Sequence, residues 1–279
     1  MEKLLMKGQI RFVIAGLLIA WGAVPACADQ IDSVFYDNRF GTINSATGAF
    51  TQVGTLPIAQ SAGIADDNGT LFAQSMQSQL ITIDPVSGLS SIIGSSGLQL
   101  SSVGFAGGLN GLFEVDTMSN LYSINPGTGA ATLVGATGLA PNYQEWDTSL
   151  SDSGTSLYFT AGGAGAIDQL YQLNPTTGVA TDLGSTGVTG IAGSAIVNGN
   201  LELFQYNAGT DHIYIAPLGS TDFLAGPSLG VQIVDGGVVV GTPAGNSRQS
   251  LATPEPFSSL LFASGLFGLG LWSRRKNNR

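Results

Sequence analysis

Few side chains in the body of this chain can carry nucleophilic or acid–base chemistry. The segment 29–253 has a single histidine, His212, and contains neither lysine nor cysteine. Cys–His catalysis, Ser–Lys catalysis and a zinc site built from several histidines are therefore excluded from this segment. A Ser-His-Asp triad would have to combine His212 with Asp211 and Ser228, the serine of the one Gly-x-Ser-x-Gly match at 226–230. That match follows the histidine and lacks the strand-to-helix context of a nucleophile elbow, so we expect ordinary strand and loop residues there.

Carboxylates offer the other route to catalysis. Hydrolysis of a glycosidic bond needs two carboxyl groups that face each other at roughly 5–10 Å. The candidate carboxylates are Asp37, Glu114, Asp116, Glu145 and Asp147. A surface glycoside hydrolase or lyase is therefore the alternative to a binding or structural protein without catalytic activity. The Asp-Asp-Asn run at 66–68 could bind calcium, but it lacks EF-hand spacing, and we expect a solvated turn.

The main candidate for ligand contact is a short aromatic and acidic stretch. It contains Tyr143, Glu145, Trp146 and Asp147, and it falls in the longest interval of the chain's internal repeat. Trp146 is the only tryptophan outside the two terminal apolar segments. An aromatic ring beside carboxylates and amides could stack on a sugar while the polar groups bind its hydroxyls. Packing of Trp146 between two repeats is the competing interpretation.

Five copies of one β-hairpin organise the chain around these residues. The clearest copy, 121–135, has an alternating strand, an Asn-Pro-Gly-Thr-Gly turn and a second strand that ends at Gly135. The residues at the proline position are Ser45, Pro85, Pro126, Pro175 and Pro217, at spacings of 40, 41, 49 and 42 residues. This is the range of propeller blades. Glycine follows three residues later in four copies and nine residues later in all five, the last being Gly226.

A second turn precedes most copies and doubles the number of strands. Asn-Gly or Asp-Gly, flanked by apolar residues, occurs at 68–69, 110–111, 198–199 and 235–236, and Asp-Ser-Gly occurs at 152–154. Such turns between apolar runs predict hairpins. Each unit of about 43 residues then holds four strands, as a propeller blade does. We therefore predict an all-β fold, a β-propeller of about five four-stranded blades over 29–243, with a β-helix or sandwich as the alternative.

The first unit lacks its leading strand, which the end of the chain must supply. We expect Val231–Val234 to add this strand and so close the ring, which removes exposed sheet edges. The sequence leaves open whether Val238–Val240 duplicates the strand at 33–36 or begins a linker.

Charge is distributed unevenly along the chain. The segment 29–253 has only two basic residues, Arg39 and Arg248, against 17 acidic ones, a net charge of −15. Such a surface repels nucleic acid and anionic lipid, so we expect no nucleic-acid partner. It could attract cations or keep a secreted protein soluble. We expect no cofactor.

The N-terminus has the pattern of a secretory signal peptide at 1–28. Basic residues precede an apolar run at 12–24, and a small-residue cleavage site follows at Ala26 and Ala28. The run is shorter than the ~20 residues that span a membrane, although a retained anchor is an alternative. Cys27 could instead carry a lipid and tether a receptor subunit, but Pro25 fits that pattern poorly. Cleavage after Ala28 leaves a mature protein without cysteine.

The C-terminus combines a motif, an apolar helix and a basic cluster. A polar linker at 244–252 leads into 253–279, whose apolar run covers 257–272. The motif residues are Pro254, Glu255 and Pro256, and the basic stop is Arg274, Arg275 and Lys276. The basic stop would hold the end in the cytoplasm. Motif, helix and basic end resemble the PEP-CTERM sorting signal of secreted bacterial proteins; a plain membrane anchor is the alternative.

That resemblance implies recognition by an exosortase-type processing enzyme, cleavage near the tripeptide, and a transient inner-membrane helix in a Gram-negative bacterium that forms biofilms. The hairpins also resemble the Leu-Tyr-x-Ile-Asn-Pro repeats of secreted bacterial propeller proteins. We therefore expect a binding or structural protein of the cell surface or extracellular matrix, with extracellular polysaccharide as the candidate partner.

Overall fold

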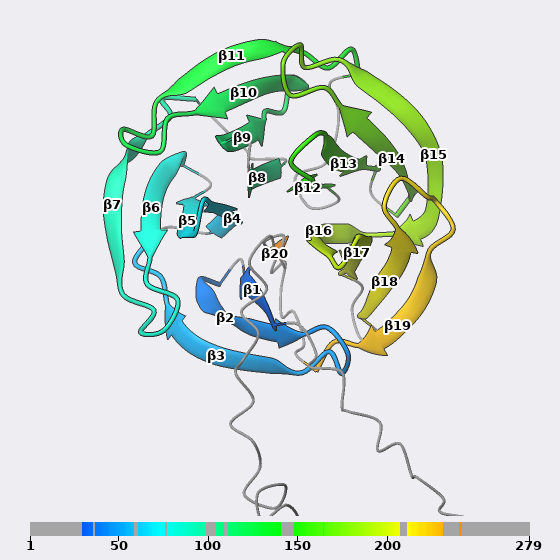
Figure 1. Ribbon diagram of the computed structural model, residues 1–279, viewed down its shortest axis with the longest axis horizontal. Helices are drawn as coiled ribbons and strands as arrows, with labels where there is room; N and C mark the ends of the chain where they lie inside the picture. The colour runs from blue at the N-terminus through cyan, green and yellow to red at the C-terminus, as the bar shows by residue number, and fades with distance from the viewer. Residues whose placement is uncertain are drawn as a thin grey trace, which may run out of the picture.

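The computed structural model describes residues 30–35, 37–58, 61–75, 77–98, 104–108, 111–140, 148–163, 165–206, 211–230 and 240–241. These residues form five four-stranded antiparallel sheets. The sheets stand around a common axis as the blades of a propeller (Figure 1). The expected fold class is confirmed. Within the described ranges, no helix is long and apolar enough to cross a membrane.

Each blade follows the chain from the axis outwards, except that the first blade takes its innermost strand from the C-terminal side (Figure 1). The first blade has β20 (Val240–Gly241), β1 (Gln30–Val34), β2 (Arg39–Asn44) and β3 (Phe50–Thr55); the second has β4 (Ser61–Asp67), β5 (Thr70–Ser75), β6 (Gln79–Ile83) and β7 (Ser90–Ser95). The third has β8 (Gly104–Gly108), β9 (Gly111–Val115), β10 (Asn120–Ile124) and β11 (Ala131–Ala136). The fourth has β12 (Thr148–Asp152), β13 (Leu157–Ala161), β14 (Ile167–Leu173) and β15 (Ala180–Thr189); the fifth has β16 (Ile191–Val197), β17 (Asn200–Gln205), β18 (His212–Pro217) and β19 (Leu224–Ser228).

The ring closes as expected in principle, but through a different strand. β20 pairs with β1 in the register Ser33 to Gly241 and Val34 to Val240. Val231–Val234, predicted to supply this strand, lies outside the described residues. The closing strand is β20, which begins at Val240. Val240 is the last residue of the stretch Val238–Val240, for which the sequence did not decide between a strand and a linker. The two ends of the folded segment thus meet in one blade, and β20 covers the inner edge of β1.

The turn of the repeated hairpin is held by an asparagine side chain and by a glycine at positive φ. Asn125 Oδ1 accepts hydrogen bonds from the backbone amides of Gly127 and Thr128 at 2.8 and 3.2 Å. Gly129 adopts a φ of 77° and donates its amide to the Asn125 carbonyl at 2.7 Å. An L-residue with a side chain would be strained at this φ. Asn44, Asp84 and Asn174 accept the same pair of amide hydrogen bonds in their own blades.

The fifth copy is offset by one residue from the predicted alignment. His212 pairs with Ser228 as Asn120 pairs with Ala136, so Pro217 occupies the position of Asn125, not that of Pro126. Gly226 is correspondingly not the equivalent of Gly135; that position falls on Pro227. The misalignment arose because Pro217 and Gly226 match the repeat by type, whereas the pairing of β18 with β19 sets the actual register.

The other repeated glycines explain how neighbouring blades approach each other at the perimeter. A Cβ on Gly54 would lie 3.4 Å from the Gly88 Cα, and a Cβ on Gly129 would lie 3.0 Å from the backbone of Gly94. A Cβ on Gly135 would collide with the carbonyl of Thr177. The outer strand of one blade therefore lies directly against the hairpin turn of the next. At Gly129 and Gly135 an added Cβ would press on the backbone of the neighbouring blade, whereas at Gly54 it would make ordinary van der Waals contact.

The hydrophobic core lies between blades. Phe72 and Leu80 of the second blade pack with Phe105, Leu112 and Ile124 of the third, and all five are buried. Equivalent clusters fill the other seams. No blade buries both faces by itself, so the ring is stable only as a whole, as expected for a repeat architecture.

Candidate functional site

Most residues predicted to carry function lie outside the described residues. This holds for the proposed ligand contacts Tyr143, Glu145, Trp146 and Asp147, for the sorting motif at 254–256, for the basic stop at 274–276, and for Ala26 and Ala28. The remaining candidates, Asp37, Glu114, Asp116, His212 and Ser228, all fall on described strands or turns.

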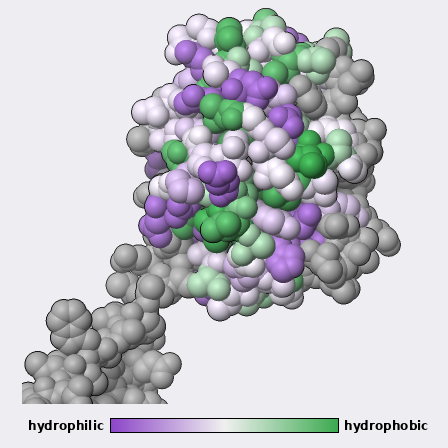
Figure 2. All heavy atoms as spheres, turned by 90° about the vertical axis from the view of Figure 1, so that its right-hand side faces the viewer, coloured by the Kyte–Doolittle hydropathy of each residue, from purple (hydrophilic) through white to green (hydrophobic). Residues whose placement is uncertain are grey.

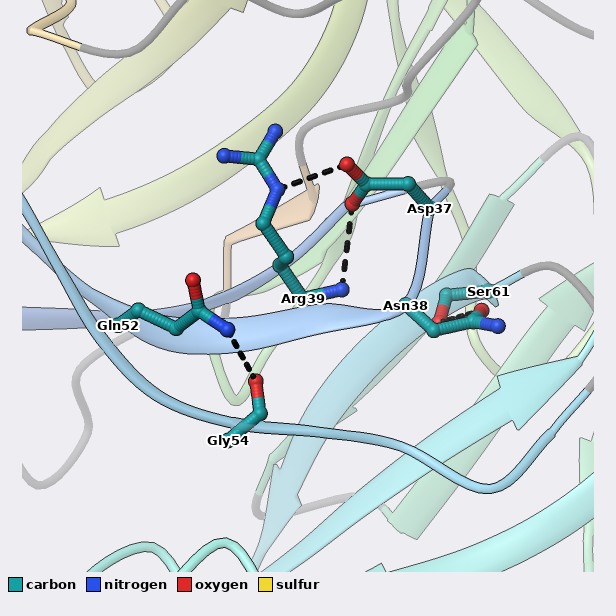
Figure 3. A network of polar contacts seen from close by, with 6 residues as sticks. All are labelled: Asp37, Asn38, Arg39, Gln52, Gly54 and Ser61. Atoms are coloured by element: carbon teal, nitrogen blue, oxygen red, sulfur yellow. Dashed lines mark hydrogen bonds and ion pairs between the residues drawn. The ribbon is translucent and has the colours of Figure 1, made fainter.

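Asp37 and Arg39 form a polar cluster at the turn between β1 and β2 (Figure 3). Arg39 Nε donates to Asp37 Oδ2 at 2.7 Å, and the Arg39 amide donates to Asp37 Oδ1 at 3.2 Å. The guanidinium carbon lies 4.8 Å from the ring centre of Phe35 and 5.9 Å from that of Phe50. Arg39 is the only lysine or arginine in the described part of the chain. Asp37 thus orients the Arg39 guanidinium over two aromatic rings, and its carboxylate is engaged in the ion pair with Arg39.

Asn38 ties the same turn to the connection that leads into the second blade (Figure 3). Its Nδ2 donates to the Ile58 carbonyl at 2.6 Å, and its Oδ1 accepts from Ser61 Oγ at 3.0 Å. Asn38 has a φ of 68°, and Ser78 and Ser119 have positive φ at the same place in their blades. Their hydroxyls donate to the carbonyls of Leu98 and Ala140. Sequence reasoning missed this repeated feature, because the residue type varies between asparagine and serine.

Glu114 lies in the seam between the second and third blades. It is 0% exposed, and its Oε2 accepts a 2.6 Å hydrogen bond from Nε2 of Gln74 on β5. Burial raises the pKa of Glu114 to about 8; the Gln74 hydrogen bond lowers this pKa and the nearby Asp116 carboxylate raises it. A carboxyl group in this position is shielded from solvent and from any substrate outside the ring.

Asp116, two residues further on, holds the turn between β9 and β10. Its Oδ1 accepts the backbone amides of Met118 and Asn120 at 3.0 and 2.7 Å, and its Oδ2 accepts from the Tyr122 hydroxyl at 3.2 Å. Burial, followed by the charge of Asp116, raises the pKa of Tyr122. The two neighbouring carboxylates therefore act on different structures: Glu114 on β9 contacts a blade seam, and Asp116 holds the turn that follows.

The Asp66-Asp67-Asn68 run forms a turn, as expected. Asp66 Oδ1 accepts the Gly69 amide at 2.9 Å, and Asp67 Oδ1 accepts from Asn68 Nδ2 at 2.8 Å. Asn68 and Gly69 have φ values of 52° and 85°, the two positive angles that a tight Asn-Gly hairpin requires. Within the described ranges, no group of three or more His, Cys, Asp or Glu side chains could hold a metal ion.

His212 and Ser228 are cross-strand partners on β18 and β19. The His212 Nδ1 lies 3.4 Å from the Gly226 carbonyl, and its ring packs edge-on against Tyr214 with centroids 6.3 Å apart. Ser228 is exposed, and its backbone carbonyl faces Gly48 of the first blade. Both residues thus contribute to strand pairing, and Ser228 contributes also to the seam that closes the ring.

An open groove of about 550 Å³ lies on the second blade. It follows the ends of β6 and β7 and includes Val86 and Leu89, which are 82% and 73% exposed. Thr82, Ser90 and Ser91 add hydroxyls to its wall. On the side of the ring over β15 and β19, hydrophobic residues occur in small groups separated by polar ones (Figure 2). Scattered apolar groups of this kind are ordinary on a soluble surface.

Comparison with known proteins supports the fold alone. No family model matches the chain, and no curated protein matches it. Among solved structures, it is similar to a chain in the crystal structure of a nidogen/laminin complex, with a TM-score of 0.50 and 9% identity over 76% of this chain and 97% of that one. The described residues form a β-propeller, and one of its structural neighbours comes from a complex between proteins.

Proposed function

We propose that this chain is a secreted binding or structural protein of the bacterial cell surface or extracellular matrix, sorted through its C-terminal segment by an exosortase-type enzyme. The observation that carries this proposal is the position of the ring within the sequence. Its described strands begin at Gln30 and end at Gly241. Both expected cleavage sites, after Ala28 and near 254–256, therefore lie outside every described strand of the ring, and processing there would leave all of these strands in the mature protein.

The described carboxylates favour binding over glycoside hydrolysis. Asp37 pairs with Arg39, Glu114 is buried against Gln74, and Asp116 caps a turn. Each already has a structural contact. Of the five candidate carboxylates, Glu145 and Asp147 are then the two that we propose for contact with an extracellular polysaccharide. Trp146 would then supply the stacking surface beside them.

Mass spectrometry of the mature protein from its native host tests the sorting proposal. We expect an N-terminus at Asp29 and a C-terminus close to Pro254–Pro256. A Glu255→Ala variant should accumulate with its C-terminal segment attached, because the motif is altered while the ring is not. A mature protein that retains residues 257–279 in the wild type would contradict exosortase sorting.

Binding is tested separately by sedimentation of the wild-type chain with purified exopolysaccharide from the same host. We expect Trp146→Ala to lose most of the bound fraction and Tyr214→Phe, a control on β18, to retain it. Equal binding by the two variants would place the ligand elsewhere. Release of reducing ends from the polysaccharide during the incubation would favour the glycosidase alternative.

A further inference from the structure

The Gln74–Glu114 contact joins two strands of different blades in the interior. Gln74 on β5 is 1% exposed and Glu114 on β9 is 0% exposed. Their one recorded hydrogen bond uses Gln74 Nε2 and Glu114 Oε2, at 2.6 Å. The other polar atom of each side chain, the amide oxygen Oε1 of Gln74 and the second carboxyl oxygen Oε1 of Glu114, is buried without a hydrogen-bond partner among the described residues. Two orphaned oxygens on one buried pair would be costly, because each loses its bonds to water.

The protonation state of Glu114 decides whether these oxygens can be satisfied. An ionised carboxylate only accepts hydrogen bonds, so it cannot bond the amide oxygen of Gln74 in either orientation of the amide. A neutral carboxyl group has one O–H donor. With that proton, the acid and the amide can exchange two hydrogen bonds, one in each direction, and both orphaned oxygens acquire a partner.

Among the described residues, the surroundings of the pair offer no positive charge that would keep Glu114 ionised. By strand register, Gly63 and Leu80 flank Gln74, while Phe105 and Tyr122 flank Glu114. Leu80 and Phe105 are each 1% exposed. A Cβ on Gly63 would lie 2.6 Å from the Phe105 Cβ, so the aromatic residue lies directly against the neighbouring blade. Apolar walls of this kind disfavour a charge.

The titratable groups near the pair favour the neutral acid as well. The Asp116 carboxylate, just beyond β9, raises the pKa of Glu114. Tyr122 on β10, which is opposite Glu114, is uncharged at neutral pH. The acids of β4, Asp66 and Asp67, form hydrogen bonds within their own turn. β5, β6 and β8 carry no ionisable side chain.

We propose that Glu114 is protonated in the folded ring and donates its proton to Gln74 Oε1, so that a closed pair of hydrogen bonds joins the second and third blades. The seam is then a proton-dependent contact. Deprotonation replaces two hydrogen bonds with one and leaves a buried charge between Phe105 and Leu80, which weakens this seam before the others.

The direction of the pH dependence follows from the two pKa values of Glu114. The ordinary value is 4.5, and burial raises the folded value to about 8. The folded ring therefore binds this proton more tightly than the unfolded chain does. The stabilisation by this proton is fully present below pH 4.5 and is lost progressively as the pH rises towards 8. Above the folded pKa of Glu114 the stability no longer changes with the titration of this group.

NMR titration of the full-length chain labelled with ¹³C-carboxyl glutamate tests the proposal directly. The chain has five glutamates, so the spectrum is simple, and the Glu114→Gln variant assigns the resonance by its loss. We expect one resonance to titrate at least two pH units above the rest and to be absent from that variant. A Glu114 resonance that titrates together with the other glutamates would overturn the proposal, whether or not the variant is stable.

Thermal unfolding between pH 5 and 8 provides the second readout. The melting temperature of the wild type should fall across this interval, whereas Glu114→Gln, which keeps an amide of the same shape, should show a much flatter profile. Asp67→Asn serves as the control, since it removes a carboxyl group from a hairpin turn of the second blade and leaves the Gln74–Glu114 pair intact; its profile should follow the wild type. A Glu114→Gln profile as steep as the wild type would refute the proton-dependent seam.

Discussion

At the scale of single residues, Arg39 shows how one side chain can stabilise a seam in a strongly acidic ring. Its guanidinium lies over Phe35, which is fully buried, and near Phe50, and the two rings meet edge-on with centroids 4.7 Å apart. Both rings pack with residues of the fifth blade. A cation over an aromatic face contributes about 0.5–2 kcal/mol, more than a typical exposed ion pair does. The aromatic contact should therefore matter more than the charge pair with Asp37.

We expect Arg39→Met to lower the free energy of unfolding by about 1 kcal/mol, because methionine keeps part of the packing but loses the cation. Asp37→Asn should cost only a few tenths of a kcal/mol, since it removes a partly exposed ion pair and retains a hydrogen-bonding side chain. Chemical denaturation at low and high salt measures both. If Asp37→Asn costs as much as Arg39→Met, the ion pair and not the aromatic contact holds this turn.

The contacts between residues of different blades could not be read from the sequence, and register is the reason. Successive residues of a strand face opposite neighbours. A seam contact therefore joins one position of a repeat to the adjacent position of the next copy: Gln74 meets Glu114, whose equivalent in the second blade is Ala73. The hydroxyls of Ser151 and Ser194, 2.6 Å apart, follow the same rule between the fourth and fifth blades. Aligning repeats column by column conceals such pairs.

At the scale of the element, the repeated glycines separate into two physical classes. Gly129 has a positive φ and also lies against the neighbouring blade, whereas Gly135 has no such φ and is constrained only by the Thr177 carbonyl. Gly187 has a φ of 70° with no atom within 4 Å of an added Cβ. The three positions therefore allow backbone strain and blade contact to be measured separately.

Substitution by alanine should reveal the two contributions. Gly187→Ala should cost about 1 kcal/mol from the left-handed backbone alone. Gly135→Ala should cost roughly 1–3 kcal/mol from the blade contact alone, and Gly129→Ala should approach the sum of the two. Valine at Gly129 should destabilise by a few kcal/mol, because a β-branched residue is strained further at positive φ. Chemical denaturation of each variant measures these costs; a Gly135→Ala variant as stable as the wild type would mean that the blades can separate at no cost.

The elements themselves were predictable where local chemistry determines them. The Asn-Pro-Gly-Thr-Gly turn and the Asn-Gly turn each specify a hairpin within a few residues, so four strands per repeat and five blades followed from spacing. The one-residue offset of the fifth copy could not be predicted from the spacing, because Pro217 resembles the turn proline but occupies the position of Asn125. Only the pairing of His212 with Ser228 reveals that register. Local signals specify turns, whereas register depends on the whole sheet.

At the scale of the whole molecule, the ring is closed at two radii by segments far apart in the sequence. At the axis, β20 pairs with β1. At the perimeter, the Gly230 amide donates to the Gly48 carbonyl at 2.7 Å, and the Ser228 backbone lies against Gly48. The perimeter contact resembles the outer-strand contacts at other seams, so the fifth and first blades meet much as sequential neighbours do. The axial contact is the one that requires the chain to return to its beginning.

Two truncations separate the ring from its C-terminal segment. A chain that ends at Thr253 keeps β20, so we expect it to melt as cooperatively as the full chain and at the same temperature within about 2 °C. A chain that ends at Gly230 keeps the perimeter contact but loses β20 and exposes the edge of β1. We expect its melting temperature to fall by roughly 5–15 °C, which corresponds to several kcal/mol for a ring of this size. The exposed edge should also promote self-association.

Calorimetry measures the change in melting temperature, and size-exclusion chromatography measures the self-association. Equal stability of the two truncated chains would mean that the perimeter contact closes the ring without β20, and a loss of cooperative melting at Thr253 would place part of the fold beyond the linker.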